Sequence, residues 1–255
     1  MDKILPSINS EEEASKIKSF IKGVLSKEKM ENVVIGISSG VDSTACLYLL
    51  RDSLPAENIY AIHLPYFEEK SSDLEEAFAQ ANLANDHKIN FSIKPIVDFM
   101  FAELNIPEDD IRRGNVMARI RMIILYDFSK KFDALVCGTE NRSENLLGYF
   151  TRFGDEASDF EPILHLYKTQ VYELAKHLGV PQSIIEKPPS ANLWENQTDE
   201  GEFGFSYLEA DPVLYLYFDK KKPIEEIEKM NLPNAGKIIN FAKKNHYKRH
   251  TPFHL

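Results

Sequence analysis

The sequence predicts a three-layer α/β/α fold on a parallel sheet, followed by a helical C-terminal segment. Short β-branched runs alternate with helical patterns, at intervals that favour parallel strands joined by crossover helices. After residue 150 this alternation ends. The chain has 255 residues, enough for a large core without disulfides or structural metals. We expect one domain over residues 1–255, with a core at about 30–180 and a loop and helices at about 188–255.

The first half of the chain supplies all of the expected strands. Apolar, partly β-branched runs predict them at 33–37, 58–64, 89–93 and 134–137. Helical spacing predicts helices at 10–25, 42–54, 72–85, up to 104, 107–131 and 142–149. Ser10 with Glu13 has capping-box spacing, and Ser72 with Glu75 repeats it. A break is expected near Arg113-Gly114 in the helix at 107–131.

The second half reads as helices separated by loops. The helices are expected at 167–178, 206–217, 224–230 and 234–245. Gly179 is a stop signal for the first of them, and Pro212 should kink or shorten the second. Residues 150–161 and 188–205 read as loops. Loops this long often cover binding sites, so we expect 150–161 and 190–205 to become ordered on substrate binding.

Charge and composition exclude several classes of protein. Thirty basic residues against 40 acidic ones give a net charge of −10, which disfavours non-specific nucleic-acid binding. No apolar run approaches the roughly 20 residues that span a membrane. The N-terminus turns acidic where a signal peptide would turn apolar, so we expect a cytoplasmic protein. Cys46 and Cys137 cannot form a disulfide framework or a four-thiolate zinc site, and we interpret both as reduced core residues.

The strongest local signal is Gly-Ile-Ser-Ser-Gly-Val-Asp-Ser at residues 36–43, between the first strand and a helix. Free amides and the helix dipole make such a turn an anion site, although it lacks the Gly-Lys-Ser/Thr ending of the common nucleotide loop. Asp42 would repel a phosphate there unless Mg²⁺ lay between them. Alternatively, Ser38 or Asp42 simply caps the helix. The residues alone leave these two interpretations open.

This loop resembles the Ser-Gly-Gly-x-Asp-Ser loop of the ATP pyrophosphatase superfamily. Other segments, in order along the chain, resemble one family within it, the ammonia-dependent NAD synthetases. They are residues 114–122, 138–144, 147–149, 150–155 with Asp159, 166–171, 187–194, 197–200 and Lys248-Arg249. The resemblance runs from about residue 10 to the end and implies an adenine nucleotide alpha hydrolase-like sheet.

The resemblance implies that ATP activates the nicotinate carboxylate of deamido-NAD as an acyl-adenylate, with release of pyrophosphate. Ammonia would then displace AMP and give NAD. No residues are left over for a glutamine-hydrolysing domain, so free ammonia, or ammonia delivered by another protein, is expected. Members of this family also imply a homodimer with deamido-NAD near the interface, and 107–131 is our candidate interface.

The resemblance also implies roles for individual residues. The ATP phosphates would be held by Gly36, Ile37, Ser38, Ser39, Gly40, Val41, Asp42 and Ser43. Further ATP contacts would come from Thr139, Lys168 and Ser190. Mg²⁺ would be bound by Asp42 and Glu144. Deamido-NAD would be contacted by Arg119, Arg152, Asp159, Tyr247 and Lys248. The catalytic residues would be Asp42, Lys168 and Asp159.

Several of these residues have plainer alternatives. Glu144 could merely complement the dipole at the start of its own helix. Lys168 could be an ordinary exposed lysine, although a cation at a helix start is slightly unfavourable. Arg119 and Arg121 lie two residues apart and so point to different sides of a helix. We expect one to serve the site and the other the surface or a subunit contact, and the resemblance selects Arg119.

The sequence departs from the family pattern at three places. Ser39 replaces the second glycine of the loop, Glu140 follows Thr139 where a smaller or less charged residue is usual, and Glu156-Ala157 replaces two glycines. The last change should stiffen a loop that is expected to move. Two other functions therefore stay open: an enzyme of the same superfamily with another acceptor, and a nucleotide-binding homologue with weakened catalysis.

Overall fold

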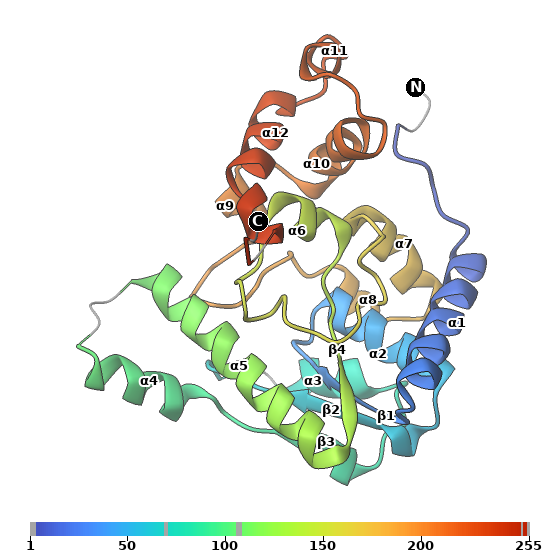
Figure 1. The fold of residues 1–255 in the computed structure, drawn as a ribbon, viewed down its shortest axis with the longest axis vertical. Coiled ribbons are helices and arrows are strands. Elements are labelled where there is room, and N and C mark those ends of the chain that lie inside the picture. The colour runs from blue at the N-terminus through green and yellow to red at the C-terminus, as the bar shows by residue number, and fades with distance from the viewer. Residues whose placement is uncertain (1–3, 69–70, 106–108, 251, 254–255) are drawn as a thin grey trace.

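The computed structural model describes residues 4–68, 71–105, 109–250 and 252–253, and its centre is a sheet of four parallel strands (Figure 1). The order across the sheet is β3-β2-β1-β4, and each neighbouring pair is parallel. The strands are β1 (Asn32–Gly36), β2 (Ile59–His63), β3 (Lys88–Asn90) and β4 (Ala134–Cys137). The chain moves outward from β1 to β3 and then returns to the other side of β1, so the topology switches between β1 and β4.

Helices cover both faces of this sheet, as the sequence predicts. The core helices are α1 (Ser10–Glu28), α2 (Val41–Ser53), α3 (Ser71–Phe78), α4 (Lys94–Glu103), α5 (Asp110–Phe132), α6 (Arg142–Leu147), α7 (Lys168–His177) and α8 (Gln182–Ile185). The C-terminal helices are α9 (Asp199–Phe203), α10 (Tyr207–Leu214), α11 (Ile224–Glu228) and α12 (Ala235–Lys244). Short helical turns lie at η1 (Ala56–Asn58), η2 (Asn85–His87), η3 (Tyr215–Asp219) and η4 (His246–Arg249).

The two faces of β1 explain why its residues are so uniformly apolar. Val33 and Ile35 belong to a core that includes α1, α2 and α7, whereas Val34 packs with Ile62 and with Met117 of α5. All five side chains are essentially inaccessible to water. Burial on both faces is typical of parallel sheets, and it favours a continuous apolar run over an alternating one.

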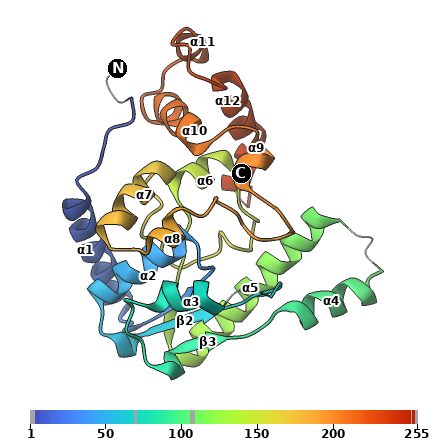
Figure 2. The same ribbon diagram turned by 180° about the vertical axis from the view of Figure 1, so that it is seen from behind.

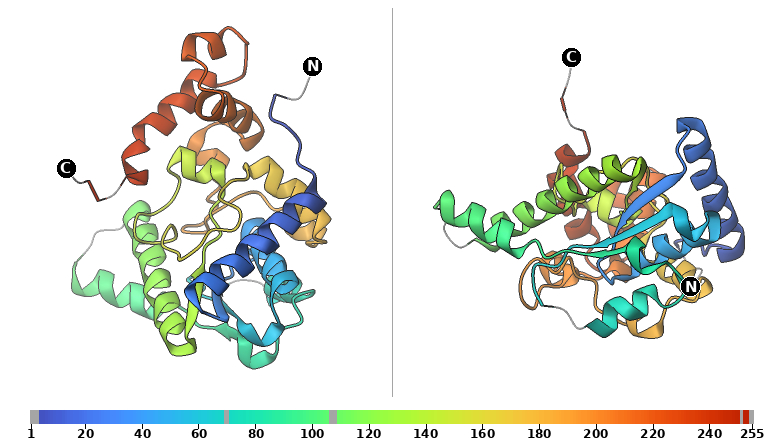
Figure 3. Two further views of the ribbon diagram at one scale, coloured as in Figure 1. Left: turned by 45° about the vertical axis from the view of Figure 1, so that its right-hand side comes forward. Right: turned by 90° about the horizontal axis from the view of Figure 1, so that it is seen from below.

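A third apolar cluster joins the C-terminal helices to the core. It combines Leu146 and Leu147 of α6 with residues of α9, α10, α11 and α12. These helices lie at the end of the molecule away from β3, as Figures 1 and 2 show from opposite sides and Figure 3 from two further directions. Because α10 and α12 pack directly on α6, the single domain of residues 1–255 stays our prediction.

Several local expectations were wrong in detail. The N-cap of α1 is Asn9, whose side chain accepts a hydrogen bond from the Glu12 amide, so Ser10 is the first helical residue and not the cap. Helix α3 ends at Phe78, well before residue 85.

Pro212 lies inside α10, and the α-helix ends two residues later in the wider π-helical turn η3. This agrees with the expected shortening, since proline cannot donate to the helical ladder.

Helix α5 differs most from its prediction. It runs from Asp110 to Phe132 without a break at Gly114, while the predicted start at Pro107 lies outside the described residues. A Cβ atom on Gly114 would lie 2.9 Å from Cδ1 of Leu193. Gly114 therefore allows the 187–198 segment to approach the helix closely, and it does not interrupt the helix.

Candidate functional site

A cleft of about 1110 Å³ opens at the carboxyl ends of β1 and β4, where the topology switches. Parallel sheets bind ligands at this position. All eight residues of the 36–43 loop line the cleft. Its other walls come from the turn after β4, one side of α5, and the segment 187–199. The cleft is large enough for a nucleotide-sized ligand.

Hydrogen bonds within the 36–43 loop hold its serines together. The Ser38 hydroxyl lies 3.1 Å from that of Ser43, and the Ser38 amide donates to Ser43 Oγ at 3.3 Å. Helix α2 starts after Gly40, which has no side chain to cap it. The interpretation of Ser38 or Asp42 as a plain helix cap is therefore wrong. The first amides of α2 lack partners within the helix and remain available to an anion in the cleft.

Ser39 has a left-handed backbone at the point where the family pattern has glycine. Its φ is +58°, a region that serine enters only at a cost. The side chain is buried, and its hydroxyl oxygen has no hydrogen-bond partner among the described residues. Serine here thus adopts a backbone conformation that favours glycine.

The centre of the site is a buried lysine between two carboxylates. Lys168, at the first position of α7, is only 3% exposed, so it is not an ordinary surface lysine. Its ammonium nitrogen lies 2.5 Å from Oδ2 of Asp42 and 3.1 Å from Oε1 of Glu144. These three residues come from α2, α6 and α7, and one cation joins them.

Side chains outside the predicted set hold this cluster in place. Asn141 donates to Oδ1 of Asp42 at 3.0 Å and also caps α6 in a capping box with Glu144. Glu144 therefore supports the start of its own helix as well as contacting Lys168. The Asn-x-x-Glu spacing at 141–144 is the signal from which Asn141 could have been predicted.

Asp211 of α10 holds the start of α7 in place through hydrogen bonds. Its carboxylate is fully buried and accepts hydrogen bonds from the Ser143 hydroxyl at 2.6 Å and from the Thr169 amide at 2.8 Å. Ser143 Oγ in turn accepts from the Lys168 amide at 2.9 Å. The available signal was an acid in the interior of the largely apolar helix α10, since buried acids need partners.

Burial and the close charges of the cluster both shift its pKa values. Burial opposes the charged form of Lys168, but Asp42 and Glu144 outweigh it and raise the pKa of this lysine well above 10.5. Burial raises the pKa of Glu144 to about 8, with Lys168 opposing the change and the Asp42 carboxylate adding to it. Two carboxylates share one ammonium, and a further cation would balance them.

These carboxylates can hold Mg²⁺ only together with ligands from a substrate. Within the described parts of the chain, no three His, Cys, Asp or Glu side chains converge as a metal site. Asp42 and Glu144 do lie at one point of the cleft wall, beside the 36–43 loop. Mg²⁺ is commonly bound by one or two carboxylates plus substrate phosphates, which this donor set fits.

The residues predicted to contact deamido-NAD lie in three places: Lys248 in the cleft wall, three residues in an exposed group, and Asp159 apart from both. Lys248 lines the cleft and donates to the carbonyls of Gly148 and Phe150, both at 2.8 Å. Arg119 and Arg152 lie outside the cleft wall, where Arg119 donates to the Arg152 carbonyl at 3.2 Å. The Arg152 guanidinium lies 5.1 Å from the ring centre of Tyr247, so these three side chains form one exposed group.

Asp159 is a predicted site residue that lies apart from both the cleft wall and this exposed group. It is exposed and outside the cleft wall, and its carboxylate accepts from the Val136 amide at 2.7 Å. Tyr126 of α5 lies 3.5 Å from its other oxygen. Thr139 and Ser190, predicted to contact ATP, do line the cleft.

The two α5 arginines lie on different sides of the cleft wall, and the role predicted for Arg119 stays a prediction. Arg121 lines the cleft and donates to the Leu64 carbonyl at 3.0 Å, whereas Arg119 is exposed. Spacing alone shows that the two point to different sides. Which side meets the cleft depends on how α5 is rotated against the sheet, and the sequence carries no local signal for that.

The two acidic departures from the family pattern point away from the 36–43 loop. Glu140 is buried outside the cleft wall, and its carboxylate lies 3.5 Å from the side-chain amide of Asn145. Glu156 accepts from the Phe153 amide at 3.0 Å and so fastens the turn in which it lies. That bond agrees with the stiffer loop predicted from the sequence.

Among the described helices, none is long and apolar enough to cross a membrane.

Comparisons with known proteins converge on one family. The sequence profile of the family NAD synthase matches residues 13–252. The NH(3)-dependent NAD(+) synthetase of Pyrococcus furiosus is 43% identical over 249 residues, which cover 96% of this chain and 94% of that relative. That of Fusobacterium nucleatum is 40% identical over 249 residues, which cover 96% and 95%.

Two solved structures are similar over nearly their whole length. The NH3-dependent NAD synthetase from Campylobacter jejuni matches with a TM-score of 0.80 at 30% identity, covering 97% of this chain and 100% of that chain. The NMN synthetase from Francisella tularensis matches with a TM-score of 0.83 at 31% identity, covering 98% and 99%. The similarity therefore extends through the C-terminal helices as well as the sheet.

Proposed function

The chain belongs to the NAD synthase family, and on that premise we propose that the cleft between β1 and β4 is where it amidates deamido-NAD with ammonia. ATP is the co-substrate, and the products are NAD, AMP and pyrophosphate. The carboxylate of deamido-NAD is a poor electrophile, and its adenylylation supplies a good leaving group. Such an enzyme has mainly to align two anionic molecules and neutralise their charge.

The observation that carries this assignment is the meeting of the 36–43 loop with Lys168. The loop offers the free amides at the start of α2 together with serine hydroxyls, both suited to the ATP phosphates. The Lys168 ammonium lies at the same wall of the cleft and is kept charged by Asp42 and Glu144. It would neutralise charge that develops on the phosphates when pyrophosphate leaves. Thr139 and Ser190 would complete the ATP contacts from the other walls.

Asp42 and Glu144 would hold Mg²⁺ together with phosphate oxygens of ATP. When bound, the ion supplies positive charge to the leaving pyrophosphate. In the absence of ATP, the Lys168 ammonium would offset the repulsion between these two carboxylates. Asn141 orients Asp42 by its 3.0 Å hydrogen bond, and Asp211 fixes the start of α7.

Deamido-NAD would extend from the cleft toward the exposed group of Arg119, Arg152 and Tyr247. Lys248 lines the cleft and is next to Tyr247 of that group in the sequence, which supports a contact with the substrate. Arg121 is added here as a further basic residue of the wall. Asp159 belongs to this site only if the substrate also runs along α5, which a homodimer through 107–131 would favour.

The decisive experiment is an assay of NAD, AMP and pyrophosphate with purified protein, Mg·ATP, deamido-NAD and ammonium, each omitted in turn. We expect equal amounts of the three products, with no NAD when ammonium or deamido-NAD is absent. Removal of Mg²⁺ with a chelator should abolish all three. If saturating ammonium gives no NAD from deamido-NAD, the proposed acceptor is wrong.

The variant Asp42→Asn tests the role of the cluster. It removes one carboxylate from the proposed metal site, and we expect kcat to fall by about a hundredfold or more. Lys168 keeps Glu144 as a partner, so the melting temperature should change little. Asp52→Asn is the matched control, because Asp52 is exposed at the far end of the same helix. Equal turnover in the two variants would remove Asp42 from the mechanism.

A second acceptor is suggested by the similarity to the Francisella tularensis structure, whose name is NMN synthetase. The mononucleotide analogue of deamido-NAD carries the same nicotinate carboxylate and lacks the adenylate half. The same assay with that analogue decides between them through kcat/KM. Deamido-NAD should be preferred, because the exposed basic group beyond the cleft offers contacts that only the longer substrate can reach.

A further inference from the structure

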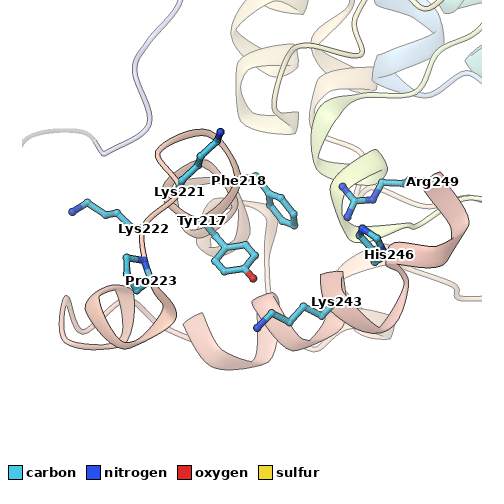
Figure 4. A pocket seen from close by; sticks show the side chains of 8 residues that line it. All are labelled: Tyr217, Phe218, Lys221, Lys222, Pro223, Lys243, His246 and Arg249. Atoms are coloured by element: carbon cyan, nitrogen blue, oxygen red, sulfur yellow. The ribbon is translucent and has the colours of Figure 1, made fainter.

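A second cavity, of about 600 Å³, lies among the C-terminal helices and shares no lining residue with the cleft (Figure 4). It is formed where η3 and the turn after it face the end of α12 and η4. Two aromatic rings, Tyr217 and Phe218, stand between these walls in Figure 4. We call this cavity the C-terminal basic pocket, because five of its side chains are basic: Lys221, Lys222, Lys243, His246 and Arg249.

The charge of this pocket is not balanced by acids of its own wall. No Asp or Glu is among its lining residues, although the whole chain has a net charge of −10. Glu226 pairs with Lys222 at 3.3 Å. The nearby carboxylate of Asp219 is taken by Arg142 and by the Tyr167 hydroxyl. Within the described residues, the structure therefore gives Lys243 and Arg249 no carboxylate partner at all.

Lys243 and Arg249 lie over aromatic rings instead. The Lys243 ammonium is 5.4 Å from the ring centre of Tyr217, and the Arg249 guanidinium is 5.1 Å from that of Phe218. Such contacts place a cation without neutralising it or using up its hydrogen-bond donors. The Nε–H of Arg249 is buried and has no hydrogen-bond partner in the described part of the chain.

The local electrostatics agree with an unbalanced positive site. Burial and the neighbouring Arg142 lower the pKa of Arg249, although Glu140 partly opposes them. The pKa of His246 is lowered by desolvation and by the nearby His250 and Arg249. The part of these shifts that comes from Arg142, His250 and Arg249 shows that positive charges lie close together here, and a bound anion would offset their repulsion.

We propose that the C-terminal basic pocket binds a small anion with two or more phosphate groups. A guanidinium presents a planar set of donors that matches phosphate oxygens, and Lys243 adds a mobile point charge on the same wall. A single phosphate would leave part of this charge unbalanced. The shared chemistry is an oligophosphate, which either inorganic pyrophosphate or a nucleoside diphosphate supplies. The rings of Tyr217 and Phe218 would favour the nucleotide if its base stacks on them.

The test measures how fast Lys243 reacts with an amine-specific ester, read residue by residue by mass spectrometry, with inorganic tripolyphosphate as the probe. Lys244 is the internal control, since it is the next residue of α12, is exposed, and does not line the pocket. At a probe concentration about twice the Kd, labelling of Lys243 should slow about threefold. Labelling of Lys244 should not change.

Sodium chloride of equal ionic strength separates binding from screening. If salt slows Lys243 as much as tripolyphosphate does, or if Lys243 and Lys244 respond alike, the pocket is not an oligophosphate site. Arg249→Gln should abolish the protection of Lys243 while the protein stays folded by its melting temperature. Protection that survives this change would also contradict the proposal.

Pyrophosphate and ADP then identify the source of the ligand. Protection by ADP at lower concentration than pyrophosphate assigns the site to a nucleotide, and equal potency assigns it to the phosphates alone. Lys243→Ala should leave NAD formation unchanged, because Lys243 lies outside the cleft. The pocket and the proposed catalytic activity can therefore fail independently of each other.

Discussion

At the scale of single residues, Ser39 shows how the protein accommodates a departure from its family. Serine in a left-handed backbone costs about 1–2 kcal/mol, and its buried hydroxyl has no partner in the described structure. We expect Ser39→Gly to raise the free energy of unfolding by about 1 kcal/mol, after allowance for the greater freedom of glycine in the unfolded chain.

Urea unfolding of the ligand-free protein measures this effect. Ser38→Gly is the control, since it removes the hydrogen bonds that Ser38 makes with Ser43 and Gly40 and should destabilise the protein. A loss of stability in Ser39→Gly would mean that the hydroxyl makes a favourable contact. In that case serine at this position would stabilise the protein relative to glycine.

A second prediction at this scale concerns the buried carboxyl of Glu140. Burial raises its pKa to about 9, with further contributions from Glu161, Glu144 and Asp155 and an opposing one from Asn145. The folded protein therefore holds this proton up to about pH 9, whereas the unfolded chain releases it near 4.5. Between those values unfolding releases a proton, so the contribution of Glu140 to stability falls as pH rises.

Glu140→Gln keeps a neutral side chain of the same shape and should flatten this dependence. Unfolding free energies at about pH 5.5 and about pH 8.5 should show a gain over wild type that is larger at the higher pH, with a limit of about 1.4 kcal/mol per pH unit. The cations Lys248 and Arg249, which interact with Glu140, would reduce that figure. Glu31→Gln, at an exposed position, should show no such gain. Parallel pH profiles of wild type and Glu140→Gln would contradict the prediction.

At the scale of the elements, α5 shows what a sequence can and cannot predict. The four strands and the 36–43 loop follow from local patterns, because buried parallel strands are apolar throughout and the loop has a distinctive composition. The break at Gly114 was predicted from helix propensity and is absent. There, the close approach of Leu193 accounts for the glycine. The positions of Arg121 and Asp211 likewise depend on how whole helices pack, and a local pattern does not contain that information.

This account of Gly114 can be tested with a matched pair of substitutions. Alanine in a helix interior is favoured over glycine by about 1 kcal/mol, so Gly23→Ala in α1, where a Cβ atom meets nothing within 4 Å, should stabilise the protein by that amount. Gly114→Ala should gain less, since Leu193 must move. Amide exchange at Leu193, which now donates to Gln197 at 2.7 Å, should become faster. An equal gain in both variants, with unchanged exchange, would show that the contact is loose.

At the scale of the whole molecule, α4 and α5 carry an apolar surface that a single chain leaves exposed. It includes Phe99 of α4 and Leu104 at the end of that helix. On α5 it includes Ile111 and Ile123, and the Ile123 side chain is 56% exposed. These helices project from one side of the core in Figure 1. Large exposed apolar side chains that gather on one part of a surface are typical of protein interfaces. This surface supports the predicted homodimer through 107–131.

The positions of the proposed substrate contacts also support a homodimer through 107–131. Arg119 lies one helical turn before Ile123 on α5, so both lie on the same face. Tyr126, three residues after Ile123, reaches Asp159. Two of the four predicted substrate contacts that lie outside the cleft wall, Arg119 and Asp159, are therefore on the face that a partner would cover. Deamido-NAD that extends from the cleft would meet the second subunit there.

We therefore predict that sedimentation finds a dimer and that Ile123→Glu converts it to a monomer, because a charge at the centre of an apolar interface has no partner. The KM for deamido-NAD should rise more than that for ATP, since the ATP contacts lie inside one cleft. Leu208→Glu is the control: Leu208 is 77% exposed on α10, away from α5, and the change should leave both the dimer and the KM values as they are. A wild-type monomer that forms NAD at full rate would show that Arg119 and Asp159 act within one chain or not at all.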